Sequence, residues 1–77
     1  MARTRTHEVV SELVANVLSV DCAVGDTVSA AQPVVLLESM KMEIPVLVEH
    51  AGTISAIKVG VGDVVQDGDV LVVVDLG

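Results

Sequence analysis

Apolar and polar residues alternate over much of this chain, in short segments that glycine and aspartate interrupt. Between residues 18 and 24 every second position is apolar and small or polar residues lie between, the apolar ones being Leu18, Val20, Cys22 and Val24. A period of two is typical of a strand with one buried face, so it predicts that Cys22 points inward as an unreactive, small apolar group. Residues 7–24 lack proline and are rich in valine, which favours strands. We expect no helix in residues 17–38.

An internal repeat with an offset of 37 residues organises the chain. Residues 17–38 align with residues 54–75 without a gap, and the Gly-Asp-x-Val segments at 25–28 and 62–65 coincide. Each half predicts a strand, a Gly-Asp turn, a short strand, a polar turn and another strand, and glycine can supply the positive φ that such turns need. Two such halves predict two small sheets packed face to face about a pseudo-twofold axis. The core is expected to include Val20, Leu36, Ile57 and Val73.

The two halves are joined by residues 36–48, in which a short polar and methionine-containing segment lies between apolar runs. This pattern predicts a hairpin with Met40 and Lys41 near its tip. The usual tip pairs, Asn-Gly and Asp-Gly, are absent. A two-residue turn would therefore force non-glycine residues to positive φ, and strain of this kind tends to mark functional positions. Pro45 lacks an N–H and should lie at a sheet edge or at the start of a strand.

Composition narrows the function classes. The chain has 77 residues, one cysteine and no aromatic residue, so it predicts one small domain without an internal disulfide. A net charge of −7 argues against binding to nucleic acid or to anionic membranes. No apolar run reaches membrane-spanning length, the N-terminus lacks a signal-peptide core, and one unpaired cysteine is typical of the cytoplasm. His7 and His50 match no metal motif, so we expect solvated histidines and no metal.

The folded domain is expected to span residues 7–77 and to follow a mobile tail of residues 1–6. Within it Lys41 is one of only two lysines, the other being Lys58. A hairpin tip does not supply the burial or the neighbouring cation that a Schiff-base or general-base lysine needs. It is well placed for acylation by another enzyme, which makes Lys41 a candidate attachment site. The chain has no nucleophile–base pair and no phosphate loop, so we do not expect an enzyme.

The segment Glu38-Ser39-Met40-Lys41-Met42-Glu43 resembles the Ala/Ser-Met-Lys-Met motif of biotinyl domains. Together with the Gly-Asp-x-Val repeats the resemblance covers about residues 8–76, and it is strongest to short stand-alone biotin/lipoyl attachment proteins of bacteria. It implies a flattened β-barrel of two four-stranded antiparallel sheets, with biotin attached covalently to Lys41. Both halves have the same length, which leaves no room for the thumb loop of some carriers. Ala15-Asn16 stands where many members have Pro-Gly.

The same resemblance implies the partners. Biotin protein ligase would read the residues around the lysine, which are Glu38, Ser39, Met40, Met42 and Glu43. The carrier would swing carboxybiotin between a biotin carboxylase and a carboxyltransferase, with an acyl-CoA as the acceptor, and would be a monomer when alone. Two alternatives stay open. One is a lipoyl carrier of a 2-oxo acid dehydrogenase or glycine cleavage system, although such domains typically carry Asp-Lys-Ala at the tip. The other is an unmodified protein-interaction β-domain.

Overall fold

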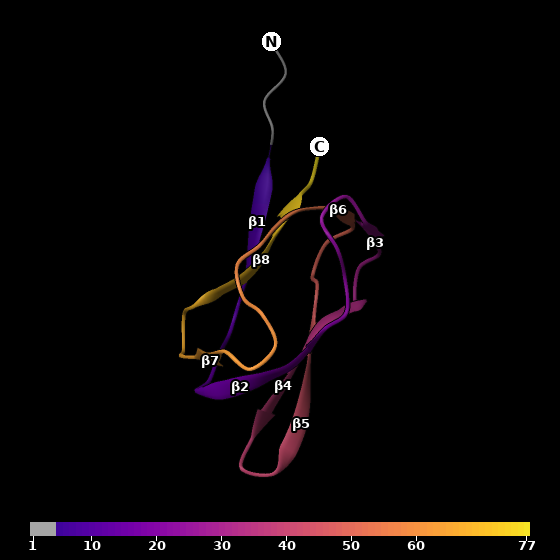
Figure 1. Cartoon of the computed structure of the whole chain (residues 1–77). Coiled ribbons are helices and arrows are strands. Elements are labelled where there is room, and N and C mark those ends of the chain that lie inside the picture. The colour runs from indigo at the N-terminus through magenta and orange to yellow at the C-terminus, as the bar shows by residue number, and fades with distance from the viewer. Residues whose placement is uncertain (1–4) are drawn as a thin grey trace.

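The computed structural model describes residues 5–77, which form two four-stranded antiparallel sheets (Figure 1). The eight strands are β1 (Thr6–Val10), β2 (Ala15–Val20), β3 (Thr27–Val28), β4 (Pro33–Ser39), β5 (Met42–Leu47), β6 (Gly52–Ile57), β7 (Val64–Val65) and β8 (Val70–Asp75). One sheet has the order β1-β8-β6-β3 and the other has the order β5-β4-β2-β7. The predicted all-β fold is confirmed, and residues 17–38 contain strands and turns only.

The pseudo-twofold symmetry is confirmed by strand order and register. Exchanging β1–β4 with β5–β8 converts the order of one sheet into the order of the other. The β4–β5 ladder sets Glu38 opposite Glu43, and the β1–β8 ladder sets Asp75 opposite Thr6, at equivalent positions. Even the irregularities repeat, because β2 and β6 carry register shifts at 17/19 and 54/56. The 37-residue repeat of the sequence is therefore a repeat of backbone hydrogen bonding.

Two equivalent turns show how the sequence produces this repeat. The Asp26 carboxylate accepts a hydrogen bond from the Ala23 N–H at 2.9 Å, and the Asp63 carboxylate accepts one from the Gly60 N–H at 2.8 Å. The glycine before each aspartate has a positive φ, 96° in the first turn and 92° in the second. A side chain at that position would strain the left-handed backbone. In each Gly-Asp pair, the glycine thus provides the positive φ of the turn and the aspartate provides its side-chain hydrogen bond.

An aliphatic core lies between the sheets. Its buried members come from both halves and are Val9, Ala15, Val17, Val28, Val34, Val35, Leu37, Val48, Ile54, Val65, Leu71, Val72 and Val74. Of the four positions predicted for the core, Val20 and Ile57 are partly buried against it. The prediction was wrong for Leu36 and Val73, which are only partly buried and lie next to fully buried neighbours.

The error has a physical cause. In β4 the consecutive residues Val34 and Val35 are both buried, because the β4–β5 pairing shifts register between Pro33 and Val35. A shift of one residue moves every later side chain to the opposite face. The run of valine and leucine is apolar on both faces, so the sequence does not record the shift. The alternation predicted for residues 18–24 also stops early, but for a different reason: β2 ends at Val20, and Val24 is 64% exposed in a turn.

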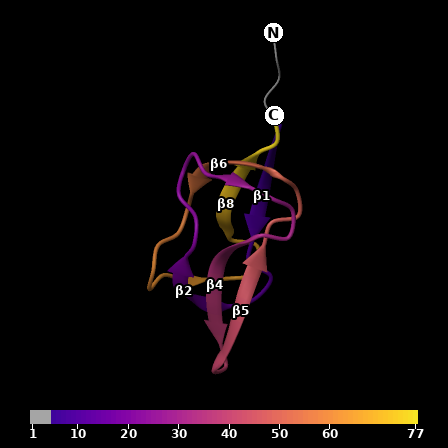
Figure 2. The same ribbon diagram turned by 90° about the vertical axis from the view of Figure 1, so that its right-hand side faces the viewer.

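The tip of the β4–β5 hairpin and the outer ends of β1 and β8 lie at opposite ends of the molecule (Figure 2). The β4–β5 hairpin projects beyond the two-sheet body, while β1 begins and β8 finishes at the far end. Residues 1–4 of the expected tail lie outside the described residues. Thr6 already belongs to β1, and the Arg5 carbonyl accepts a hydrogen bond from the Leu76 N–H at 2.6 Å. Within residues 5–77 no helix is long and apolar enough to cross a membrane.

Candidate functional site

The hairpin tip is a two-residue turn. Ser39 and Met42 form the last pair of the β4–β5 ladder, and Met40 and Lys41 connect them with φ values of 52° and 64°. Two consecutive positive φ values match a type I′ turn, whose twist suits a hairpin but which normally uses asparagine, aspartate or glycine. The predicted backbone strain at Met40 and Lys41 is thus present. Among the described non-glycine residues only Ala31 shares this conformation.

Apolar side chains at the tip face solvent. Met40 is 91% exposed and Met42 is 63% exposed, and Lys41 between them is exposed as well. Such side chains bury little area, so they contribute little to folding. Two exposed methionines flanking an exposed amine form a small, flexible apolar surface of the kind that partner proteins bind.

Acidic residues lie directly below the tip. Glu38 and Glu43 are opposite each other in the β4–β5 ladder, so their side chains project from the same face of the sheet. Like charges in this arrangement destabilise a sheet. Asn16 pairs with Glu38 on the next strand, and Val64, 66% exposed, pairs with Asn16. The sequence analysis did not anticipate that Asn16 and Val64 extend this row, because the contacts are set by strand order.

The second lysine lies elsewhere. Lys58 follows the last residue of β6, and its backbone N–H donates to the Leu71 carbonyl at 2.8 Å. Its equivalent in the other half is Asp21, whose N–H makes the matching bond to the Val34 carbonyl at 2.8 Å. Lys58 is therefore part of the body of the barrel, whereas Lys41 occupies a turn that extends beyond it. The chain offers one lysine with a distinctive setting.

Cys22 and the two histidines lie away from the tip. Cys22 is partly buried against the core, and burial, followed by the charges of Asp26 and Asp21, raises the pKa of its thiol. A raised pKa leaves little thiolate, which agrees with the predicted unreactive cysteine. His7 and His50 lie far apart in the sequence, but in the fold their ring centroids are 5.2 Å apart at an angle of 89°. Within residues 5–77 no group of three or more His, Cys, Asp or Glu residues is arranged to hold a metal ion.

Comparison with known proteins identifies the family of this chain. The family model described as "Biotin-requiring enzyme" matches residues 8–74. The chain belongs to this biotin/lipoyl family. A family relative, the biotinylated protein TB7.3 homolog of Mycobacterium leprae, is 51% identical over 68 residues, which cover 88% of this chain and 96% of the relative. The family assignment therefore rests on nearly the whole of both chains.

Solved structures of the family share the fold. The Kluyveromyces lactis urea carboxylase matches with a TM-score of 0.87 and 30% identity over 96% of this chain, which corresponds to 6% of that enzyme. A single-chain, multi-domain long-chain acyl-CoA carboxylase also gives a TM-score of 0.87, with 28% identity over 94% of this chain and 7% of its own. The lipoyl domain of the Azotobacter vinelandii 2-oxoglutarate dehydrogenase complex gives 0.66, with 26% identity over 92% of both chains.

Proposed function

We propose that this protein is a biotin carrier, modified on Lys41, that moves a carboxyl group from a biotin carboxylase to a carboxyltransferase. The observation that carries the proposal is the tip itself. Lys41 stands in a strained two-residue turn between two exposed methionines, at the end of a hairpin that projects from a barrel of the biotin/lipoyl family. Relatives named as biotinylated proteins and as a biotin carboxyl carrier support biotin as the group it carries.

The chain's own residues supply attachment and reach. Covalent attachment of biotin requires only an accessible amine, and Lys41 fits this need because its side chain is exposed and its Nζ can form an amide with an activated biotin carboxyl group. The amide removes the positive charge of Lys41, so the net charge changes from −7 to −8. Once attached, biotin supplies the ureido nitrogen on which carboxyl transfer depends, and the protein leaves that chemistry to its partner enzymes. The barrel holds the base of the arm, which makes the protein a carrier and not an enzyme.

The residues around the lysine are proposed as the surface that biotin protein ligase reads. Met40 and Met42 offer apolar contacts, and the partly buried Ser39 fixes the last ladder pair below the turn. Glu38 and Glu43 place two carboxylates on one face, where cationic groups of the ligase can bind them. Two glutamates opposite each other destabilise the hairpin, and a need for both in ligase recognition would explain why they are present.

The acceptor, the oligomeric state and the cellular location are proposed on the same basis. The structural match to an acyl-CoA carboxylase supports an acyl-CoA as the final acceptor. A net charge of −7 disfavours self-association, so a monomer is proposed for the isolated carrier. A single free cysteine suits the reducing cytoplasm, where we place the protein.

The alternative carriers are weaker. A lipoyl carrier would share the fold, and a lipoyl domain does match, but its TM-score of 0.66 is below the 0.87 of the two carboxylases. The tip also lacks Asp-Lys-Ala. An unmodified interaction domain would leave the strained turn at Lys41 without a purpose. The intact mass of protein isolated from its own host separates the three possibilities, because it shows a biotinyl group, a lipoyl group or neither.

The attachment site is tested directly with ligase, ATP and biotin. Digestion and sequencing of the product should place all of the label on Lys41 and none on Lys58. A Lys58→Arg variant is the matched control, and it should be labelled at the wild-type rate. Label on Lys58, or unlabelled Lys41 in a folded protein, would overturn the proposal.

A further inference from the structure

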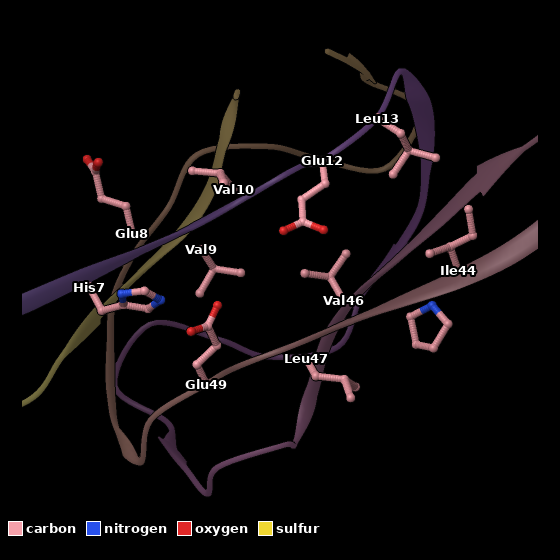
Figure 3. Close-up of a pocket in the computed structure, with 11 residues that line it drawn as sticks. His7, Glu8, Val9, Val10, Glu12, Leu13, Ile44, Val46, Leu47 and Glu49 are labelled. Atoms are coloured by element: carbon pink, nitrogen blue, oxygen red, sulfur yellow. The ribbon is translucent and has the colours of Figure 1, made fainter. Parts of the chain in front are cut away.

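A groove of about 350 Å³ opens between β1 and β5, which are terminal strands of the two different sheets (Figure 3). Its walls are related by the pseudo-twofold axis, because every lining residue except Leu13 has its 37-residue mate on the opposite wall. Val9 corresponds to Val46 and Glu12 corresponds to Glu49. The groove therefore lies on the axis of the molecule, and it is separate from the hairpin tip.

The groove combines an apolar floor with acidic rims. Val9 is buried and Val46 is partly buried. Glu12 and Glu49 are exposed, and they project into the groove from opposite rims, one above Val46 and the other beside Val9 (Figure 3). The described lining contains no lysine and no arginine. Two carboxylates thus face the same small volume, and His7, which lies beside Glu49, is the only basic side chain of the lining (Figure 3).

We propose that this groove docks an arginine side chain from an extended segment of a partner protein. The aliphatic stem of an arginine can pack on Val9 and Val46 while its guanidinium group lies between Glu12 and Glu49. The planar guanidinium donates five hydrogen bonds in a fixed geometry that suits carboxylates, which a lysine ammonium cannot match. The volume suits one or two side chains and is small for a larger ligand.

The surrounding strands indicate that the occupant is a protein segment. Each terminal strand has one edge that carries no ladder, and an extended peptide can add to such an edge. On the β5 wall, Pro45 lacks an N–H and blunts the edge, whereas the equivalent position of the β1 wall is Glu8. The backbone of the partner should therefore pair along β1. This docking does not depend on modification of Lys41, so it stands or falls separately from the proposed carrier function.

The test uses the full chain with Lys41→Arg, so that no arm is present, and a capped synthetic peptide of sequence Val-Arg-Val-Arg-Val. Amide shifts in a nitrogen-15 NMR titration should change along β1 and β5 and at Glu12 and Glu49. Replacing each arginine of the peptide with neutral, nearly isosteric citrulline should weaken binding by at least about tenfold, since charge-assisted hydrogen bonds are lost. Equal binding of the citrulline peptide, shifts at the hairpin instead, or no shifts would overturn the proposal.

A matched pair of variants separates the groove from general attraction to an acidic protein. The double variant Glu12→Gln/Glu49→Gln should also lose at least about tenfold in affinity. The double variant Asp21→Asn/Asp67→Asn removes the same charge from exposed positions outside the groove and should stay within about twofold. If both pairs weaken binding equally, the attraction is non-specific and the groove is not a site. Superposable amide spectra of the free variants would establish that each is folded.

Discussion

The two ends of the barrel have the same ladder and different chemistry. At one end β4 pairs with β5, and Glu38 lies opposite Glu43 beneath a strained turn. At the other end, called the termini end, β8 pairs with β1 in the same register and Asp75 lies opposite Thr6. No turn connects these two strands. The equivalent cross-strand position therefore carries two acids at the tip end and one acid with a hydroxyl at the termini end. Because the two ladders have equivalent registers, we expect the acidic pair and the strained turn of the tip to be dispensable for folding.

The largest expected effect concerns modification. Lys41→Arg should abolish biotinylation while the free energy of unfolding changes by less than about 0.5 kcal/mol, because the side chain is exposed. Mass spectrometry after the ligase reaction and urea denaturation measure the two quantities. A folded Lys41→Arg protein that still accepts biotin would remove the functional difference between the ends.

The next effect should appear at the termini end. A Cβ on Gly52 would lie 2.7 Å from Cγ1 of Val74 and would also clash with the Asp75 carbonyl. Overpacking of this kind costs about 2 kcal/mol, so Gly52→Ala should lower the urea midpoint. Its twofold mate, Ala15, is 4% exposed and already accommodates a methyl group. Unchanged stability of Gly52→Ala would mean that position 52 accommodates a methyl group as well as position 15 does.

A smaller effect on stability is expected at Met42. Met42 is 63% exposed, so Met42→Ala should cost less than about 1 kcal/mol, well below the loss for a buried methionine. The initial rate of biotinylation should fall several-fold, since the apolar surface beside the lysine is lost. The thermal midpoint measures the change in stability, and the initial rate of the ligase reaction measures the change in biotinylation. A large loss of stability with an unchanged rate would make Met42 a folding residue and weaken the contrast between the ends.

The smallest effect should be a gain. Glu43→Thr gives the tip end the residue that Thr6 supplies at the termini end, and it removes the repulsion with Glu38. Stability should rise by a few tenths of a kcal/mol, more at low salt than at high salt, while the biotinylation rate falls. Thr6→Glu, which creates a like-charged pair with Asp75 at the termini end, should lower stability by a similar amount without changing the rate. A loss of stability for Glu43→Thr, or a gain for Thr6→Glu, would refute the comparison.

The sequence predicted the parts of this molecule that depend on local chemistry. The Gly-Asp turns, the repeat and the hairpin at Lys41 could be predicted because glycine, aspartate and an interrupted apolar run carry those signals directly. The faces of β4 and β8 could not be predicted, since register shifts there act on strands that are apolar throughout. The His7–His50 contact and the groove between β1 and β5 were missed as well, because both join residues from different halves that only the folded strand order brings together.

The β1–β8 ladder, opposite the tip, would allow the proposed attachment site to be copied to that end of the barrel. Leu76 and Arg5 are already hydrogen-bonded, and Gly77 already has a φ of 96°, the sign that the first turn residue needs. In a chain shortened to begin at Arg5, one bridging residue between Gly77 and Arg5 would complete a loop as long as Met40-Lys41. Such a chain could be opened at the present tip and closed at the other end. With the tip left intact in a cyclic chain, and a Met-Lys-Met sequence written into the new loop, the same barrel would present two arms pointing in opposite directions.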